Sequence, residues 1–318
     1  MTTPQRRIGS GFGGRSTARE VLDGIDLTGR LAVVTGGYSG IGLETTRALA
    51  EAGARVVVPA RRPEAAAEAL AGVEGVEVDG LELSDQDDVR AFAERFLGTG
   101  RAIDVLVNNA GVMACPQAAA GPGWEYQFAT NHLGHFTLVN RLWPALAEGG
   151  ARVVSVSSGA HQASPIRWED PWFARGYDRW LAYGQSKTAN ALFALHLDRL
   201  GEPLGVRAFS LHPGSILTPL QRHMTRREMV DAGWVDGNGE LIDPRFKTPE
   251  QGAATQVWAA TSPRLAGMGG VYCEDCDVAV PAGTEPGVEG VRDHAADPAQ
   301  AERLWAFSAE LTGENALA

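Results

Sequence analysis

The feature that most constrains the fold of this chain is a repeated alternation between short apolar runs and longer stretches with helical spacing. Uninterrupted runs of Val, Leu and Ile are typical of strands that are buried on both faces of a parallel sheet. We expect strands at 31–34, 55–58, 76–83, 103–107, 152–155 and 206–211, and helices at 40–52, 64–70, 124–146 and 183–200. A further helix should begin at Ser84-Asp85, with Val89, Phe92 and Phe96 at helical spacing. This order predicts an α/β fold with three layers, in which helices cover both faces of a doubly wound parallel sheet of six or seven strands.

Composition and charge exclude several classes of protein. The chain has 318 residues, 44% of them hydrophobic, which is enough for one large core. Its net charge of −11 and its lack of a Lys/Arg block argue against a nucleic-acid partner. Three cysteines are too few for a disulfide framework, so we expect reduced thiols and a cytoplasmic location. Residues 1–19 lack the apolar run that a signal peptide or a membrane helix requires, and we expect no membrane partner.

The first 27 residues differ from the rest of the chain. They contain several glycines and arginines and show no apolar periodicity before about Val21. We therefore expect residues 1–27 to form a flexible extension with few contacts to the core, and residues 28–318 to form a single domain.

A glycine-rich segment lies directly between the first expected strand and the first expected helix. It reads Thr35-Gly36-Gly37-Tyr38-Ser39-Gly40-Ile41-Gly42. Glycines allow a sharp turn and a close approach of the backbone to a ligand, while the N-terminus of a helix offers free N–H groups to an anion. In this position the segment predicts a site for the pyrophosphate of a dinucleotide.

Three further motifs follow in order along the chain. Asn108-Asn109-Ala110-Gly111 comes after the fourth strand, Tyr183-Gly184-Gln185-Ser186-Lys187 lies on a helix, and His212-Pro213-Gly214 follows the sixth strand. Together with the spacing of the glycine-rich segment, these motifs resemble the short-chain dehydrogenase/reductase family. Val156–His161 and Ala182–Asn190 are similar to its retinol-dehydrogenase-like branch. The resemblance implies a Rossmann fold and an NAD(P)-dependent oxidoreductase that moves a hydride between a nicotinamide and an alcohol or carbonyl carbon.

The resemblance also implies four catalytic residues. Tyr183 would exchange a proton with the substrate oxygen, Ser158 would hydrogen-bond that oxygen, Lys187 would bind the nicotinamide ribose, and Asn131 would support a proton relay. Residues four apart share one face of a helix, which brings the Lys187 ammonium near the Tyr183 phenol. A positive charge about 4 Å from the phenol would lower its pKa by roughly 3 units at an effective dielectric near 20.

By the same resemblance, a larger set of residues binds the cofactor: Gly36, Tyr38, Ser39, Gly40, Ile41, Gly42, Arg61, Arg62, Glu82, Leu83, Asn109, Ala110, Gly111, Tyr183, Lys187, Pro213, Gly214, Ile216 and Thr218. Members that prefer NAD(H) carry an Asp at the position of Ala60. Here Ala60 is followed by two arginines, which favours NADP(H) over NAD(H). The alternative is that Arg61 and Arg62 form only a solvated entry to a helix. Two departures weigh against the preference: Ser39 stands where many NADP-using relatives have a basic residue, and Glu82 where the family usually has Asp.

The substrate side is less constrained. Residues 217–247 should form a lid over the nicotinamide, with Met224, Met229, Trp234 and Phe246 as candidates for one wall of the pocket and Trp168, Trp172 and Trp180 for the other. This lining favours a small, apolar substrate, although core packing would explain the same residues equally well. The resemblance further implies a homodimer or homotetramer that assembles through the helices around Asn131 and Tyr183.

Several residues suggest chemistry that we do not assign. Cys273 and Cys276 have Cys-x-x-Cys spacing, but no second pair of ligands accompanies them, and His132 and His135 lack further zinc ligands. We therefore expect no metal site. His161 lies close enough in sequence to Ser158 to contact the substrate. Two alternative functions remain, namely double-bond reduction or epimerisation on the same scaffold, or a protein that binds the cofactor without catalysis.

Overall fold

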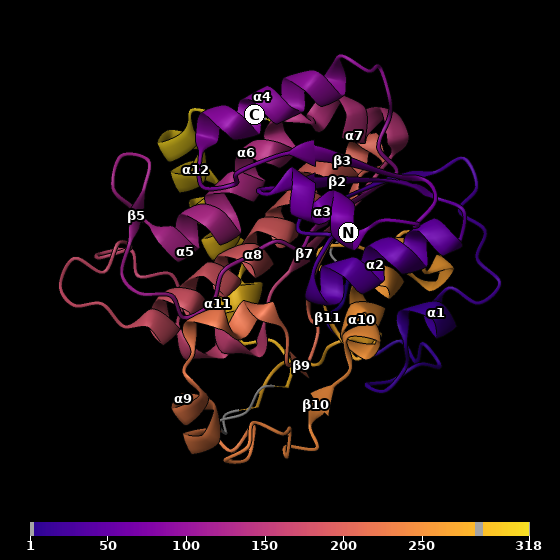
Figure 1. Cartoon of the computed structure of the whole chain (residues 1–318). Helices are drawn as coiled ribbons and strands as arrows, with labels where there is room; N and C mark the ends of the chain where they lie inside the picture. Colours follow the sequence, from indigo (N-terminus) through magenta and orange to yellow (C-terminus); the bar gives the residue numbers. More distant parts are fainter. Residues whose placement is uncertain (1–2, 284–288, 318) are drawn as a thin grey trace.

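The computed structural model describes residues 3–283 and 289–317, which are built around one eight-stranded sheet (Figure 1). Its strand order is β12-β11-β8-β7-β4-β1-β2-β3; all neighbours are parallel except β11 and β12. The strands are β1 Leu31–Val34, β2 Arg55–Ala60, β3 Val76–Gly80, β4 Val105–Asn108, β7 Arg152–Val156, β8 Arg207–His212, β11 Tyr272–Glu274 and β12 Asp277–Val278. The predicted doubly wound α/β fold is confirmed, and one short antiparallel strand extends the predicted parallel set.

Helices cover both faces of this sheet. Ala32 and Val34 of β1 pack into the core on the side of α2 and α10, whereas Leu31 and Val33 pack on the side of α4, α6 and α8. This division follows from the pleat, because successive side chains of a strand point to opposite faces. The helices concerned are α2 Gly40–Glu51, α3 Pro63–Ala69, α4 Gln86–Leu97, α6 Gly134–Arg141, α7 Trp143–Gly149, α8 Arg179–Gly201, α10 Pro249–Thr261, α11 Asp293–Ala296 and α12 Pro298–Thr312.

Polar caps set the ends of the longer helices. The Asp85 carboxylate accepts hydrogen bonds from two N–H groups in the first turn of α4, and Asp178 does the same for α8. These bonds satisfy donors that have no partner inside a helix. At the far end of the chain, Gly313 adopts a left-handed conformation and stops α12.

The single helix predicted over 124–146 is wrong, because this stretch is divided into shorter elements. It contains β6 Trp124–Glu125, α5 Tyr126–Phe128, a five-residue π-helix at Ala129–Leu133, then α6 and α7. The break between α6 and α7 falls at Leu142, two residues before Pro144. Pro144 has no N–H to bond the carbonyl four residues earlier, so the regular helix cannot continue through it.

The N-terminal segment packs on the far edge of the sheet, so the prediction that it makes few core contacts is wrong. The Gln5 side chain accepts a hydrogen bond from Tyr272 N and donates to Tyr272 O and Ala279 O. The Asp277 carboxylate accepts from the N–H groups of residues 8, 9 and 10. Helix α1, Ala18–Val21, then packs on α10 (Figure 1). Periodicity gave no signal because most of these contacts are polar bonds between distant residues.

Helix α12 lies across the outer surface of α6 and α8. Trp305 of α12 packs against Phe136 of α6 and Phe193 of α8, and Leu304 is buried with Leu133 and Leu192. The helix surfaces that we expected to form a subunit interface are therefore covered by the last helix of the same chain.

Candidate active site

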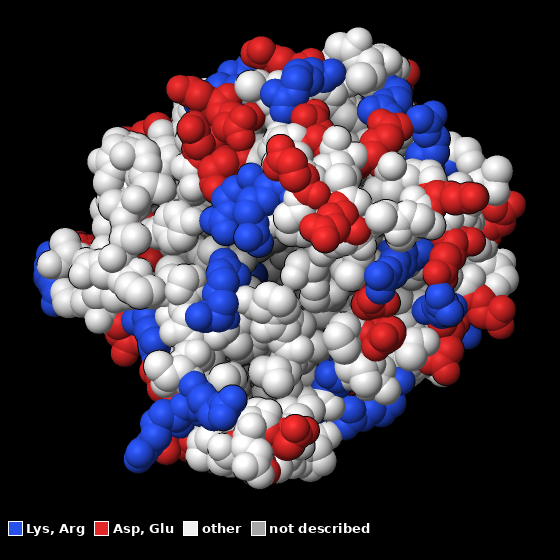
Figure 2. Space-filling view, in the orientation of Figure 1, with Lys and Arg blue, Asp and Glu red and all other residues white. Residues whose placement is uncertain are grey.

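The carboxyl ends of the parallel strands open into a cavity of about 940 Å³. Figure 2 shows it as a hollow with mostly uncharged walls and basic side chains along its rim. All the predicted cofactor residues except Gly42 line this cavity, and Ser158 lines it as well. Gly42 and Asn131 lie directly behind the lining. Ligand sites of doubly wound sheets occur at this edge, so the cavity is in the place that the fold predicts.

The glycine-rich loop has the shape that a pyrophosphate requires. Gly36 and Gly40 have φ angles of +64° and +53°, a region that favours glycine. A Cβ atom on Gly42 would lie 2.4 Å from both the Gly36 carbonyl oxygen and Asn109 Nδ2, so any larger residue would displace the loop. Helix α2 begins at Gly40 and directs the free N–H groups of its first turn toward the cavity. These features fit the pyrophosphate of NAD(P).

Thr35 connects this loop to the Asn-Asn-Ala-Gly turn. Its hydroxyl oxygen accepts hydrogen bonds from the N–H groups of Asn109 and Ala110, each at 3.0 Å. His135 Nε2 lies 2.9 Å from the same hydroxyl, and His135 Nδ1 lies 3.0 Å from the Asn131 carbonyl oxygen. Burial lowers the pKa of His135 to about 4, so its ring is neutral. The sequence pattern did not indicate this role for His135, because its partner Thr35 is 100 residues away in the chain.

Three of the four predicted catalytic side chains meet inside the cavity. The Tyr183 phenol interacts with the Ser158 hydroxyl, and Lys187 Nζ lies 5.6 Å from the centroid of the Tyr183 ring. Lys187 Nζ donates to the Val156 carbonyl oxygen at 2.9 Å, and Ser158 Oγ accepts from Ala160 N at 3.1 Å. Tyr183 and Lys187 reach one another because α8 is helical through both residues.

The expected lowering of the Tyr183 pKa does not hold in this structure. Burial raises the pKa of Tyr183 to about 12, and the hydrogen bond to Ser158 opposes this increase only in part. Burial also lowers the pKa of Lys187 to about 7, because a desolvated ammonium is disfavoured. Attraction between the ammonium and the phenolate would lower the pKa of Tyr183 only if both groups kept their solvent, and here both are buried.

Asn131 lies in the π-helix and braces the turn after β4. Its Oδ1 accepts from Val112 N at 2.8 Å, and its Nδ2 donates to Val112 O and to Ser186 Oγ. A Cβ atom on Gly111 would come within 3.0 Å of Asn131 Oδ1, so this contact also needs the glycine. The Asn131 side chain therefore positions this part of the cavity wall.

Arg61 and Arg62 lie at the end of the cavity where the second strand finishes. Both are exposed, and Ala60 is buried at the same end. Arg61 Nε lies 3.7 Å from Glu82 Oε2, which makes a loose ion pair across this part of the cavity. Glu82 is held in turn by the N–H and the hydroxyl of Ser84.

The opposite end of the cavity is apolar. Trp234, Phe246 and Trp180 line it, and Met224 packs beside Tyr183. Met229 does not line it. Two of the tryptophans predicted for the second wall belong to the core instead: Trp168 and Trp172 both pack on Phe307.

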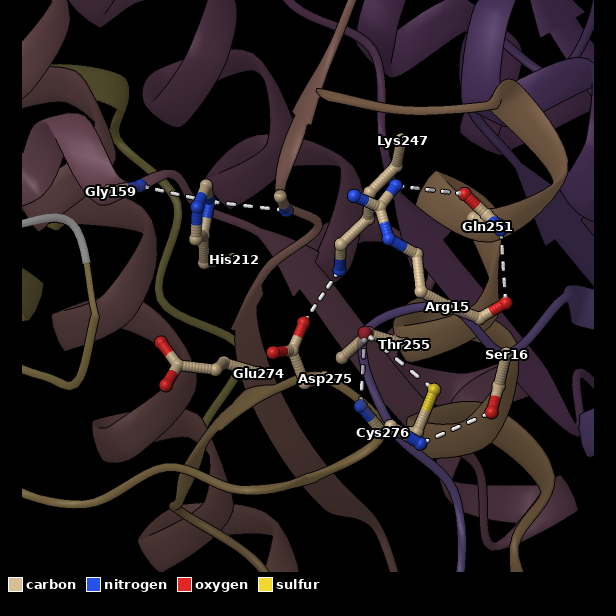
Figure 3. Close-up of polar contacts among 12 residues, drawn as sticks. Arg15, Ser16, Gly159, His212, Lys247, Gln251, Thr255, Glu274, Asp275 and Cys276 are labelled. Atoms are coloured by element: carbon tan, nitrogen blue, oxygen red, sulfur yellow. Dashed lines mark hydrogen bonds and ion pairs between the residues drawn. The ribbon is translucent and has the colours of Figure 1, made fainter. Parts of the chain in front are cut away.

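Residues 217–247, the segment expected to form a lid, contribute Thr218, Trp234 and Phe246 to this part of the cavity lining. They contain η4 Pro219–His223, α9 Arg226–Asp231 and β10 Phe246–Lys247, and β10 pairs with β9 Ser215–Ile216. An ion pair between Arg179 of α8 and Glu228 ties α9 to the domain. At the C-terminal end of this segment, Lys247 Nζ lies 2.6 Å from Asp275 Oδ1 (Figure 3). Arg15 of the N-terminal segment donates to Phe246 O at 2.8 Å.

The other residues singled out from the sequence have structural surroundings. Cys273 lies in β11 and Cys276 in the tight turn that leads to β12, and both thiols are buried. His132 Nε2 hydrogen-bonds Ser308 Oγ at 2.7 Å. His161 is fully buried behind the Ser158 loop and does not line the cavity. Within residues 3–283 and 289–317, no group of three or more His, Cys, Asp or Glu residues could hold a metal ion.

Comparison with known proteins agrees with this geometry. The sequence profile of the short chain dehydrogenase family matches residues 30–229, and the chain belongs to that family. It is 49% identical over 298 residues to the "Probable oxidoreductase" of Streptomyces lividans, covering 90% of this chain and 98% of that one. It is 38% identical over 296 residues to mouse (Mus musculus) "Retinol dehydrogenase 12", covering 91% and 88% of the two chains.

A solved structure from Mycobacterium paratuberculosis superposes with a TM-score of 0.69 at 34% identity, covering 91% of this chain and 96% of the other. The chain is therefore an NAD(P)-dependent short-chain dehydrogenase/reductase, similar to the retinol dehydrogenases. In the part of the chain that the structure describes, no helix has both the length and the apolar character that a bilayer span requires.

Proposed function

We propose that this protein is an NADP(H)-preferring oxidoreductase that interconverts an alcohol with a ketone or aldehyde in a small, apolar substrate. The observation that carries the proposal is the meeting of Tyr183, Ser158 and Lys187 in one cavity beside a glycine-rich helix N-terminus. A proton donor, an oxygen-binding hydroxyl and a cation next to a dinucleotide-shaped site are the groups that carbonyl reduction needs.

In the reducing direction the chain's residues would act on the carbonyl oxygen. Bound NADPH would supply the hydride that reaches the carbonyl carbon. The Ser158 and Tyr183 hydroxyls would both hydrogen-bond the oxygen, and Tyr183 would give its proton to that oxygen as the carbon is reduced. The Lys187 ammonium would then stabilise the phenolate left on Tyr183 until a solvent proton restores it. Alcohol oxidation reverses each of these steps.

The preference for NADP(H) rests on charge at the adenosine end of the cavity. Arg61 and Arg62 are both exposed there, and Ala60 leaves no carboxylate that would repel a 2′-phosphate. Arg61 makes only a 3.7 Å contact to Glu82, so it can turn toward a phosphate at little cost. The alternative is that Arg61 and Arg62 are only solvated residues at the start of α3. In that case NADPH and NADH should bind with equal affinity.

The apolar lining of the lid end supports a hydrophobic substrate. Trp234, Phe246 and Trp180 offer aromatic surface, and Leu220 and Met113 add aliphatic surface. The similarity to mouse Retinol dehydrogenase 12 supports the same class, since its name specifies an apolar alcohol. We also propose a cytoplasmic location, because all three cysteines are free thiols.

The test is a direct assay of purified protein with NADPH and three carbonyl probes: retinal, decanal and acetophenone. We expect cofactor oxidation at 340 nm together with formation of the matching alcohol. The matched control is Tyr183→Phe, which should lose nearly all turnover and keep NADPH binding within a few-fold. Full turnover in Tyr183→Phe would refute the mechanism. A reduced double bond in place of an alcohol would favour the alternative reaction on this scaffold, and bound NADPH without turnover of any probe would favour the non-catalytic alternative.

A further inference from the structure

The peptide group between Ser158 and Gly159 is held on both sides by side chains that come from other elements. Its N–H donates to His212 Nδ1 at 3.0 Å, and His212 is the last residue of β8 (Figure 3). Its carbonyl oxygen lies 2.7 Å from His161 Nδ1 and accepts from the Tyr272 hydroxyl at 3.2 Å. The loop that carries Ser158 is thus fixed by β8, β11 and the 3₁₀-helix η2 Gly159–Ala163.

The bonds of His212 also fix its protonation. Nδ1 faces two donors, Gly159 N and Gly214 N at 3.4 Å, so it carries the lone pair and the proton of the neutral ring lies on Nε2. Burial lowers the pKa of His212 to about 3, which keeps the ring neutral at working pH. One imidazole nitrogen therefore joins the serine loop to Gly214 in the cofactor loop.

On the carbonyl side the tautomer is equally determined. Arg292 N donates to His161 Nε2 at 3.2 Å, so His161 carries its proton on Nδ1 and donates it to the Ser158 carbonyl oxygen. Tyr272 is 3% exposed, and its hydroxyl ends at the same oxygen. The side chains of His212, His161 and Tyr272 therefore hold the peptide between Ser158 and Gly159 in one orientation.

We propose that His212 is a positioning residue, which sets the orientation of the Ser158 hydroxyl through its bond to Gly159 N. This inference rests on the proposed function, because it assigns the role of His212 through that of Ser158. The Ser158 hydroxyl projects into the cavity from a residue whose following peptide is the restrained one. Rotation of that peptide would displace Ala160 N, which donates to Ser158 Oγ at 3.1 Å, and so release the hydroxyl from its orientation toward Tyr183.

The test compares His212→Ala with His212→Asn. Asn Oδ1 lies as many bonds from the backbone as His Nδ1 and is also an acceptor, so Asn can keep the bond to Gly159 N, whereas Ala cannot. We expect His212→Ala to lower kcat by about 10- to 100-fold with the fastest carbonyl probe, and His212→Asn to stay within about threefold of the parent chain. Melting temperatures and NADPH titrations on each variant establish that it is folded.

His196→Asn is the matched control. His196 is also a buried histidine, but it packs on Trp305 at the opposite side of α8 from the cavity. We therefore expect both His196→Asn and His212→Ala to lower the melting temperature, because each removes a buried imidazole. Only His212→Ala should lower kcat. Equal losses of kcat in His212→Asn and His212→Ala, with both folded, would overturn the proposal, because the acceptor atom would then not matter.

A double-mutant cycle separates this inference from the proposed function. If His212 acts through Ser158, then His212→Ala should cost little further kcat in a Ser158→Ala background. Additive losses in the double variant would refute positioning by His212 and leave the role of Ser158 intact. If Ser158→Ala alone retains full kcat, the proposed function of Ser158 fails, and the inference about His212 fails with it.

Discussion

The indole of Trp305 lies parallel to the ring of Phe193, with a centroid separation of 5.8 Å and an interplanar angle of 3°. Phe193 belongs to α8, the helix that also carries Tyr183 and Lys187. The stacking therefore places α12 on the back of the helix that carries these two candidate catalytic residues.

This arrangement predicts that the protein does not associate through α6 and α8. We expect a mass of 33.7 kDa in size-exclusion chromatography with light scattering, because α12 occupies the surface that a second copy would use. A chain that ends at residue 297 should expose this surface and form dimers or larger species. A dimer of the full chain that is unaffected by surface changes on α12 would show that another interface exists.

The N-terminal segment should contribute to stability through Asp277. Asp277→Ala should lower the free energy of unfolding by about 1–3 kcal/mol, because it leaves three N–H groups of residues 8–10 without their acceptor. The measurement is urea unfolding followed by circular dichroism. Asp23→Ala, an exposed position, should change stability by less than about 0.5 kcal/mol. Equal stability of the two variants would mean that the segment is bound too weakly to matter.

Cofactor preference should reside in Arg61 and Ala60. One charge-assisted bond from an arginine to the 2′-phosphate predicts that NADPH binds about 10- to 100-fold more tightly than NADH. The double variant Ala60→Asp, Arg61→Ala should reverse this order, because the new carboxylate repels the phosphate and accepts from a ribose hydroxyl. The measurement is the dissociation constants of NADPH and of NADH for each protein at fixed salt. Equal values for the parent chain would contradict the preference for NADPH.

The two directions of the reaction should depend on pH in opposite ways. With the Tyr183 pKa raised to about 12, the phenol keeps its proton across the working range and is ready to donate it in carbonyl reduction. Lys187 loses its positive charge as pH rises through about 7, so stabilisation of the phenolate weakens and reduction should slow above that pH. Alcohol oxidation needs the deprotonated phenol and should accelerate as pH rises.

This pH dependence is measured as kcat from pH 5.5 to 9.5 in each direction. Lys187→Met, which has no charge to lose, should be slower throughout and should lack the decrease of the reduction rate near pH 7. The same decrease in Lys187→Met would assign it to another group, and a rate of reduction that increases with pH would contradict the assignment of Tyr183 as the proton donor.

The sequence was most informative where chemistry depends on local spacing. Gly36, Gly40 and Gly42 were recognised because a turn between strand and helix needs them, and Tyr183 and Lys187 because one helical turn brings them together. The apolar strand runs predicted the parallel sheet, since burial on both faces leaves a clear pattern in the sequence.

What the sequence did not indicate depends on contacts between distant residues. The side chain of Gln5 reaches the backbone of Tyr272, and Trp305 reaches Phe193, and neither pair leaves a periodic signal. His212 was noticed only as part of a motif with Pro213 and Gly214, because its partner Gly159 lies on a different strand end. The pKa of Tyr183 was misjudged for a related reason: burial depends on the whole fold.

The bonds between Gln5 and Tyr272 have a consequence for biosynthesis. Residue 5 leaves the ribosome early in synthesis, whereas its partner, residue 272, leaves the exit tunnel only when most of the chain has been made. The nascent protein therefore carries the segment around Gln5 undocked throughout nearly all of its synthesis, where proteases and chaperones can reach it. Docking of this segment on the sheet is therefore among the last steps of folding. The same segment bonds Phe246, near the end of residues 217–247, through Arg15.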